Sequence, residues 1–423
     1  MSGRAWLLAG LSAGLAAVPA ADAPARATAP VLHVAGNHFV DVQGRDTRLF
    51  PMHFGTGEYT CVEPVYDASR REGVFSGPTT TTPLAPMRAW HANAVRISLN
   101  EQCWLGVNPV RRGVPPGYGI APITGAAARR AGARLGARYR SAVRTVVARA
   151  HRAGLAVVFD LHWSAAGDAI AHAQWQLPDR QYSIPFWRSV ARMFRSDRSV
   201  MFELFNEPTR IPASALSWRC VRDGCRLPNA CADCDDSITT NTAGCGRRCP
   251  TPRRPRGSYR TAGTQELVDA VRATGARQPI LVPGRFYDND LGRWLQYRPT
   301  DPLGQIAATF HVYENLPCAN EACWTRAVAP VAARVPVVAT EFGATMAGQT
   351  EPCPGVARFD VRFMRWADAH GVSYGGFRWT ADFFHFPAPQ CSYDLLAAYD
   401  GTPRYGQGRA IHDHMVRVAP ALR

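Results

Sequence analysis

Residues 200–208 read Val-Met-Phe-Glu-Leu-Phe-Asn-Glu-Pro, and this stretch decides the fold. Its first part, Val200–Phe205, is a mostly apolar run of strand length, and Pro208 ends it because proline has no N–H to donate. Strands that are apolar on both faces belong to parallel sheets that are covered on both sides. The stretch therefore predicts a buried strand that ends in an amide beside a carboxylate, Asn206-Glu207.

Seven other runs of this kind occur along the chain, and helical patterns separate them. A hairpin over residues 31–50, with turn signals at Gly36-Asn37 and Gly44, leads into the first. The eight predicted strands are Leu49–Phe54, Ala94–Leu99, Leu155–Leu161, Val200–Phe205, Pro279–Pro283, Ile306–Phe310, Pro336–Thr340 and Gly375–Trp379. The predicted helices cover residues 84–92, 134–153, 185–195, 264–275, 321–333, 357–370 and 404–416. Eight strands that alternate with helices predict an α/β fold, a (β/α)8 TIM barrel.

The composition fits one large globular domain over residues 31–423. Of the 423 residues 46% are hydrophobic and 19% are charged, which allows a large core and excludes a disordered chain. Residues 210–262 are rich in Cys, Pro and Arg, and we expect a disulfide-rich loop insertion there, after strand four. This insertion would lie on the face where barrel enzymes place their active sites.

Residues 1–23 have the layout of a secretory signal peptide. Arg4 precedes an apolar run, Ala5–Val18, and small residues follow at Val18-Pro19-Ala20 and Ala21-Asp22-Ala23. The run is shorter than the ~20 residues that cross a bilayer, and no later segment is apolar and long enough. Residues 24–30 form an Ala/Pro spacer. We expect a secreted, extracellular protein with no membrane contact once the signal is removed.

The twelve cysteines agree with an oxidising compartment, where an even number is expected to pair. Their positions near neighbouring loops suggest the pairs Cys61–Cys103, Cys318–Cys323 and Cys353–Cys391. The other six are close together in the sequence, with a spacing that also resembles a structural zinc site. Behind a signal peptide we favour three disulfides in this cluster, of unspecified connectivity. The cluster consists of Cys220, Cys225, Cys231, Cys234, Cys245 and Cys249.

The formal charge of +15 comes entirely from arginine, because the sequence contains no lysine. A basic chain can bind nucleic acid, and several arginines gather in one Pro-rich stretch. Tyr259 is the only aromatic residue there, and no groove-reading module is recognisable, so we expect a solvated basic loop and no nucleic-acid partner. The clustered arginines are Arg247, Arg248, Arg253, Arg254, Arg256 and Arg260. A second set of arginines, mostly at four-residue spacing from Arg130 to Arg144, predicts the solvent-exposed face of an amphipathic helix.

Two predicted strands end in carboxylates. Glu207 follows the strand of residues 200–205, and Glu341 follows Pro336–Thr340 in the stretch Val-Val-Ala-Thr-Glu-Phe-Gly. Parallel strands of one barrel end at one face, so the two carboxyl groups are expected to meet. Hydrolysis of a glycosidic bond needs two carboxyl groups, one protonated and one ionised. The sequence therefore predicts a glycosidase site.

With these motifs the chain resembles glycoside hydrolase family 5, the cellulase family of retaining (β/α)8 barrels. The resemblance covers most of residues 45–416, because further motifs recur strand by strand in the same order. It implies that Glu207, in Asn-Glu-Pro, is the acid/base and that Glu341 is the nucleophile. It also implies a metal-free site and no cofactor.

Other positions of the family's motif match in sequence order. The resemblance implies that Arg96 hydrogen-bonds the nucleophile, that His162 lies at the substrate floor, and that Asn206 accompanies the acid/base. It implies further that Tyr313, in His311-Val312-Tyr313, orients the nucleophile and that Trp379 stacks under the sugar. The matching positions are Arg96, His162, Asn206, Glu207, His311, Tyr313, Glu341 and Trp379.

The substrate is less constrained than the chemistry. Aromatic rings near the predicted strand ends can stack on sugars, and we expect Trp163 to do so and about half of the others to be core. The others are Trp104, Trp175, Tyr287, Trp324, Phe383 and Phe384. Through Asp288–Leu291, the His311 strand and Cys318–Trp324 the chain most resembles secreted bacterial endoglucanases. We therefore expect a monomeric endo-β-1,4-glucanase acting on a polysaccharide or oligosaccharide, with a β-mannanase or other β-glycanase, and then a non-catalytic sugar-binding barrel, as alternatives.

Overall fold

The computed structural model describes residues 28–55, 57–58, 61–62, 84–109, 124–171, 174–210, 213–228, 257–343, 356–381 and 394–418. Within these ranges, eight strands form one sheet with parallel neighbours that curves into a nearly closed barrel. In sheet order they are β4 (Pro51–Phe54), β5 (Ala94–Asn100), β6 (Ala156–Trp163), β7 (Val200–Glu203), β10 (Ile280–Val282), β11 (Ile306–Tyr313), β12 (Val337–Gly343) and β13 (Ser373–Tyr374). The predicted (β/α)8 fold is confirmed.

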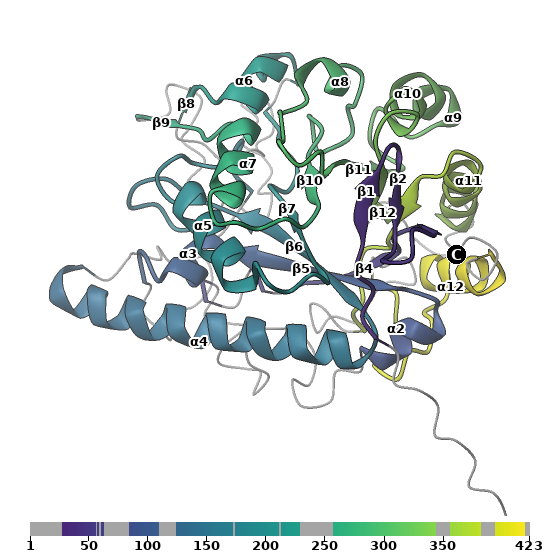
Figure 1. The fold of residues 1–423 in the computed structure, drawn as a ribbon, viewed down its shortest axis with the longest axis horizontal. Coiled ribbons are helices and arrows are strands. Elements are labelled where there is room, and N and C mark those ends of the chain that lie inside the picture. The colour runs from purple at the N-terminus through teal and green to yellow at the C-terminus, as the bar shows by residue number, and fades with distance from the viewer. Residues whose placement is uncertain are drawn as a thin grey trace, which may run out of the picture.

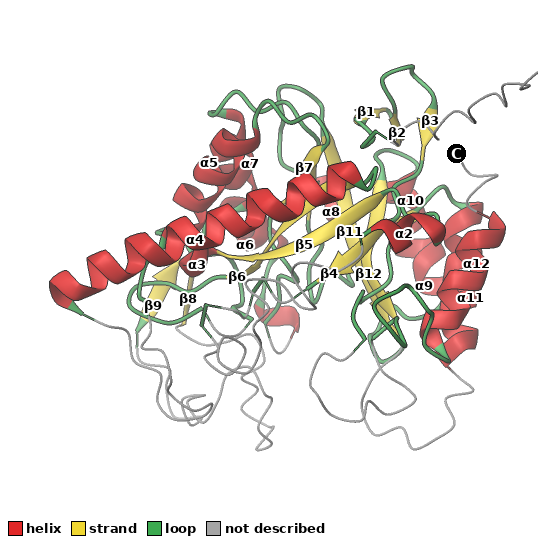
Figure 2. Cartoon of the chain, turned by 90° about the horizontal axis from the view of Figure 1, so that it is seen from below, coloured by secondary structure: helices red, strands yellow, loops and turns green. Residues whose placement is uncertain are grey.

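Helices surround this sheet (Figures 1 and 2). They are α2 (Ala85–Ala89), α3 (Glu101–Leu105), α4 (Gly125–Arg152), α5 (Ser183–Phe194), α6 (Trp218–Asp223), α7 (Thr264–Arg272), α8 (Trp294–Tyr297), α9 (Glu321–Cys323), α10 (Ala329–Ala332), α11 (Val356–Ala369) and α12 (Gln407–Val418). A π-helical turn, Trp324–Val328, joins α9 to α10, and a 3-10 turn covers Ala213–Ala215. The helix predicted at residues 134–153 begins earlier, at Gly125, because the alanine-rich stretch before it also favours a helix.

Helix α4 is amphipathic, as the arginine spacing predicts. Tyr139, Val143 and Ala150 are buried against the barrel. Arg130, Arg134 and other arginines of this helix are exposed. The long helix runs across the molecule in Figure 1 and extends beyond the sheet.

The N-terminal hairpin covers the end of the barrel at which the strands begin. Strands β1 (His33–Ala35), β2 (His38–Val40) and β3 (Asp46–Thr47) form a small antiparallel sheet. Leu32 and Phe39 pack onto buried apolar side chains from the strands of the barrel. Those side chains are Leu49, Ala94, Ala156, Val158, Met201, Leu281, Ala307 and Val338. We call this cluster the apolar floor.

The eighth strand differs from its prediction. It occupies residues 373–374, whereas the sequence predicts residues 375–379, so that boundary is wrong. The predicted residues instead bridge to β4 through single backbone bonds: the N–H of His53 donates to the carbonyl of Gly376, and the N–H of Trp379 donates to the carbonyl of His53. The segment therefore completes the barrel without a regular ladder, which its apolar composition alone could not indicate.

Gly375 lies at this seam, where two backbones approach closely. A Cβ atom at this position would lie 1.5 Å from the carbonyl oxygen of Pro51 on β4. That contact is with backbone, which cannot rotate away, so the seam requires glycine.

The insertion after the fourth strand is partly described. Strands β8 (Arg226–Pro228) and β9 (Ser258–Arg260) pair as an antiparallel ribbon at its base. Cys220 and Cys225 form a disulfide there. The other four cysteines of the cluster lie outside the described residues. So do the clustered arginines Arg247, Arg248, Arg253, Arg254 and Arg256. The zinc alternative for those four cysteines is therefore untested.

Two of the predicted disulfides are confirmed, Cys61–Cys103 and Cys318–Cys323. The third, Cys353–Cys391, lies outside the described residues. So do the predicted signal peptide and most of the spacer at residues 24–30. Among the described residues no helix is both long enough and apolar enough to cross a bilayer.

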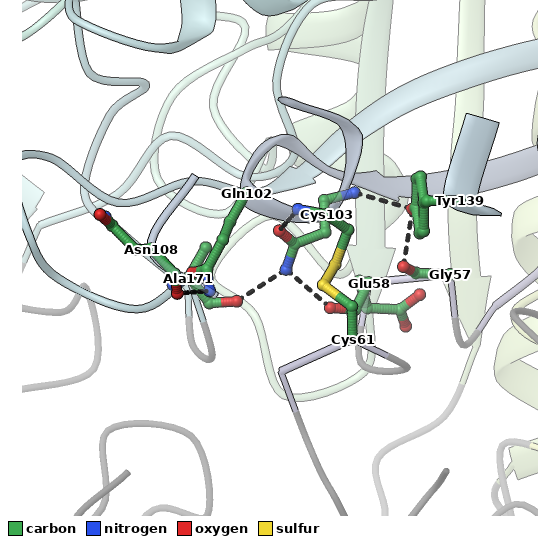
Figure 3. The surroundings of a disulfide bond; sticks show 9 residues. Gly57, Glu58, Cys61, Gln102, Cys103, Asn108, Tyr139 and Ala171 are labelled. Atoms are coloured by element: carbon green, nitrogen blue, oxygen red, sulfur yellow. Dashed lines mark hydrogen bonds between the residues drawn. A yellow bond between two sulfur atoms is a disulfide. The ribbon is translucent and has the colours of Figure 1, made fainter. Parts of the chain in front are cut away.

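The Cys61–Cys103 disulfide belongs to a network that fastens the loop after β4 to the end of β5 (Figure 3). The Tyr139 hydroxyl of α4 donates to the carbonyl of Gly57. The side-chain amide of Asn100 donates to the carbonyls of Glu58 and Ala171. A covalent bond and several hydrogen bonds thus hold three segments at the carboxyl ends of the strands.

We expect Gly375→Ala to lower the free energy of unfolding by about 3 kcal/mol, because either strand must move to accept the methyl group. Urea denaturation followed by tryptophan fluorescence measures this. Gly292→Ala is the control, since a Cβ there would meet only a side-chain oxygen of Asp290, at 3.2 Å, and should cost less than about 1 kcal/mol. Equal losses in the two variants would contradict the argument.

Candidate active site

The side chains that fill the barrel change from apolar to charged along the strands. On β5, Ala94 belongs to the apolar floor, and Arg96 follows two residues later on the same face. On β6, Val158 belongs to the floor, and Asp160 and His162 follow at alternate positions. The charged layer thus lies toward the carboxyl ends of the strands, where barrel enzymes hold their active sites.

Arg96 is fully buried and joins three carboxylates. Its Nε and Nη2 donate to the two oxygens of Glu203, at 2.7 and 2.9 Å. Nη2 also lies 3.1 Å from Oδ2 of Asp160, and Nη1 donates to Oε1 of Glu341. Burial alone would lower the pKa of Arg96, but the three carboxylates raise it well above its ordinary value. The guanidinium therefore stays charged inside the barrel.

Glu341 is held as an ionised carboxylate. The hydroxyl of Tyr313 donates to its Oε2 at 2.8 Å, and Arg96 donates to its other oxygen. Burial alone would raise the pKa of Glu341, but the positive charges of His311 and Arg96 outweigh it and hold the pKa well below its ordinary range. This is the charge state that a nucleophile requires.

Glu207 has the opposite tendency. Burial raises the pKa of its carboxyl group, the hydrogen bond with His311 lowers it, and the negative charge of Glu341 raises it, with a net rise above its ordinary value. Its backbone adopts a φ of +51°, a left-handed conformation that is uncommon for a residue other than glycine. Residues held in such conformations often occur at functional sites.

His311 connects the two carboxyl groups. Its Nδ1 lies 2.9 Å from Oε1 of Glu207 and 3.7 Å from Oε2 of Glu341. Burial alone would lower the pKa of His311, but the charge of Glu341 and the hydrogen bond with Glu207 raise it to about 9. One oxygen of Glu207, one of Glu341 and one ring nitrogen of His311 all lie within 4.8 Å of one another.

Two further histidines lie beside Arg96. His162 Nδ1 is 2.6 Å from Oδ2 of Asp160; burial would lower the pKa of His162, but Asp160 raises it to about 9. His53 Nδ1 accepts from Nη1 of Arg96 at 2.8 Å. Burial and the Arg96 charge lower the pKa of His53 well below its ordinary value, so His53 is neutral.

Asn206 lies between Arg96 and Gln174. Its Oδ1 accepts from Nη2 of Arg96 at 2.9 Å, and its amide donates to Oε1 of Gln174 at 3.2 Å. Gln174 in turn donates to the backbone carbonyls of Asn206, at 2.6 Å, and of Glu207, at 3.1 Å. These bonds fix the backbone that carries Glu207.

The aromatic residues are more deeply buried than the sequence suggests. Trp379 is fully buried and packs edge-on against Trp90, with ring centroids 4.8 Å apart, so the face expected to stack under a sugar is covered. Trp163 is only 7% exposed. Trp104 and Trp324 are core residues, and their indole N–H groups donate to Ser189 and to the carbonyl of Cys318.

Of the remaining predicted sugar platforms, Trp175 is buried and meets Tyr259 edge-on. Tyr287 is half-buried, with a φ of +57°. Phe383 and Phe384 lie outside the described residues. The core assignments agree with the expectation that part of this set packs in the interior.

The structure brings together Arg96, His162, Asn206, Glu207, His311, Tyr313 and Glu341, all named from the sequence. It adds Glu203, Asp160, His53, Thr340 and Gln174, which sequence reasoning did not select. A signal for Glu203 was present, because a carboxylate inside an apolar strand must find a buried partner. Gln174 gave no such signal, since its bonds go to backbone atoms of a distant segment.

The polar barrel interior and the carboxyl pair define a glycoside hydrolase, and comparison with known proteins agrees. The family model Cellulase (glycosyl hydrolase family 5) matches residues 68–383. The chain therefore belongs to glycosyl hydrolase family 5. A search of curated proteins gives no match.

Solved structures share the fold at low sequence identity. A β-glucanase from Saccharophagus degradans, SdGluc5_26A, has a TM-score of 0.58 and 17% identity over 94% of this chain and 95% of its own. An endocellulase from the archaeon Pyrococcus horikoshii has a TM-score of 0.56 and 16% identity over 92% and 99%. The catalytic domain of Thermobifida fusca endoglucanase Cel5A has a TM-score of 0.51 and 15% identity over 91% and 97%.

We expect Arg96→Met to lower the free energy of unfolding by about 3–5 kcal/mol at pH 8, because buried carboxylates lose their cation. The loss should be smaller at pH 5, since those carboxyl groups can then take up protons and become neutral. Urea denaturation at both pH values measures it. Arg138→Met, on the exposed face of α4, should change stability by less than about 0.5 kcal/mol. A loss in Arg96→Met that does not depend on pH would contradict the charge argument.

Proposed function

We propose that the protein is a secreted, retaining endo-β-1,4-glucanase that uses Glu341 as nucleophile and Glu207 as acid/base. The observation that carries this proposal is the pair itself: one oxygen of Glu207 lies within 4.8 Å of one oxygen of Glu341, and the pKa values of the two groups are shifted in opposite directions. Retaining glycosidases separate their two carboxyl groups by about 5–5.5 Å, whereas inverting enzymes need about 6.5–9.5 Å to admit a water.

In the first step the ionised Glu341 attacks the anomeric carbon, and Glu207 gives its proton to the departing glycosidic oxygen. The bond between that oxygen and the anomeric carbon breaks as the glycosyl–Glu341 ester forms. Arg96 and Tyr313 hold the nucleophile through opposite carboxylate oxygens, so that it enters the reaction oriented and charged. The orientation of the reacting groups lowers the entropic cost of the attack.

In the second step Glu207, now ionised, takes a proton from water as the water attacks the anomeric carbon. The ester breaks, Glu341 leaves as a carboxylate, and the sugar keeps its original configuration. His311, next to both carboxyl groups, stabilises the negative charge as it moves between them. No step needs a metal, because the charge on each carboxylate is balanced by protein groups.

The assignment to glucan rests on a solved relative and on the residues beside the carboxyl pair. One solved relative in the same fold, the S. degradans β-glucanase, is crystallised in complex with cellotetraose. His162, a member of the charged layer that is 9% exposed, is our candidate for the floor of the sugar-binding site, with Trp163 next to it in the sequence. The disulfides of the described residues and the signal-like N-terminus support secretion.

The substrate proposal predicts rapid loss of viscosity with carboxymethyl-cellulose or mixed-linkage glucan, together with release of reducing ends. Glu341→Gln should lower kcat by about 10⁴-fold or more, because it removes the nucleophile. Activity confined to galactomannan would reassign the protein to the mannanases. Inactivity on every polymer and on cello-oligosaccharides, with oligosaccharide binding retained, would favour the non-catalytic barrel.

The stereochemical proposal predicts that two variants give glycosyl azides of opposite anomeric configuration. With an aryl cellobioside whose leaving group needs no protonation, Glu207→Ala plus azide should give a glycosyl azide of retained configuration, since the glycosyl–Glu341 ester still forms. Glu341→Ala plus azide should give the inverted azide, because azide then takes the place of the nucleophile. Proton NMR of the anomeric signal distinguishes the two. An inverted product from Glu207→Ala would refute the assignment.

A further inference from the structure

A chain of hydrogen bonds leads from Glu207 into the interior of the barrel. His311 meets Glu207 through Nδ1 at 2.9 Å and the hydroxyl of Thr340 through Nε2 at 3.0 Å. The same hydroxyl lies 2.9 Å from Oε1 of Glu203. Glu203 also receives two hydrogen bonds from Arg96. His311, Thr340, Glu203 and Arg96 are all fully buried.

The directions of these bonds follow from the chemistry of each group. Burial raises the pKa of Glu203 and Arg96 counteracts this rise, and both carboxyl oxygens accept from Arg96. With Glu203 as an acceptor, the hydroxyl of Thr340 donates its single proton to Oε1 of Glu203. A lone pair of the Thr340 hydroxyl oxygen then faces Nε2 of His311. The hydrogen bond between these two atoms requires a hydrogen on Nε2. Once Nε2–H is fixed, the neutral His311 ring has a bare lone pair on Nδ1, which faces Glu207.

We propose that Thr340, held by Glu203, locks His311 in its Nε2–H tautomer and thereby makes Glu207 keep its acid proton to higher pH. When the Glu207–His311 pair loses its shared proton, an ionised Glu207 faces the Nδ1 lone pair at hydrogen-bond distance. That arrangement is repulsive. A ring free to change tautomer would relieve it by placing a proton on Nδ1, which would stabilise the deprotonated and inactive pair.

The charged groups on the Nε2 side of the ring favour the same tautomer, and Glu341 on the Nδ1 side opposes it. Asp288, after β10, has Oδ2 3.8 Å from Nε2, and Oε1 of Glu203 is 4.0 Å from Nε2. Both attract a proton to Nε2. On the other side, Glu341 lies 3.7 Å from Nδ1 and favours a proton there, so the hydrogen bond with Thr340 must outweigh this attraction. Thr340 is therefore a positioning residue that acts through His311.

The inference rests on the proposed roles of Glu207 and Glu341, and its test separates the two. In the wild-type protein labelled with ¹⁵N, the long-range ¹H–¹⁵N pattern of the His311 ring, assigned by its loss in His311→Gln, should report Nε2–H above the pH at which the pair deprotonates. An Nδ1–H pattern would overturn the inference even if the protein hydrolyses glucan. Absence of any hydrolysis with an Nε2–H ring would instead count against the proposed function.

The kinetic test uses Thr340→Val, which keeps the shape and removes the hydroxyl. We expect the alkaline limb of its kcat/KM profile to move about one pH unit lower, because the free energy of one buried hydrogen bond corresponds to about one pKa unit. The acidic limb should stay unchanged. Thr340→Ser should restore the wild-type limb. Thr209→Val is the matched control, because that buried hydroxyl has no hydrogen-bond partner among the residues that the structure describes. An unmoved alkaline limb in Thr340→Val, or an equal shift in Thr209→Val, would overturn the inference.

Discussion

The interaction on which the site depends is the burial of the Arg96 guanidinium among Asp160, Glu203 and Glu341. A charge in the protein interior is costly unless its partners are close and well oriented, and here they are. The cation balances the charge of three carboxylates in the charged layer, next to the apolar floor. The guanidinium also fixes the positions of these carboxylates. It holds Glu203 fully buried in the barrel and Glu341 at the end where the strands terminate.

The same network gives two chemically identical side chains different charges. Glu341 lies between Arg96, Tyr313 and His311, whereas Glu207 has His311 and the negative field of its partner. Positions that differ by a few ångströms therefore separate an ionised carboxylate from one that tends to hold a proton. The barrel scaffold contributes by ending β7 and β12 at one face, so that residues 134 positions apart in the chain become neighbours (341 minus 207).

Most of the strands and the residues at their ends could be predicted from the sequence, because apolar runs followed by polar residues mark buried parallel strands. The eighth strand was misplaced, since residues 375–379 look like a strand but bind β4 through isolated backbone bonds. Glu203 and Thr340 belong to the same motifs as Glu207 and Glu341, but their hydrogen-bond partners lie on other strands, which the motif sequence does not indicate. The burial of Trp379 depends on packing against Trp90, which no local pattern reveals.

The apolar floor determines from which side substrate and water can approach the site. Leu32 and Phe39 cover the end of the barrel at which the strands begin, so we expect substrate and water to reach Glu341 from the side on which the strands end. A departing saccharide and the water that replaces it would then pass on the same side of the barrel. With the glycosyl ester on Glu341 that we propose, sugar hydroxyls held at this side of the barrel would compete with water for the anomeric carbon, and crowding there would shift the balance from hydrolysis toward transglycosylation.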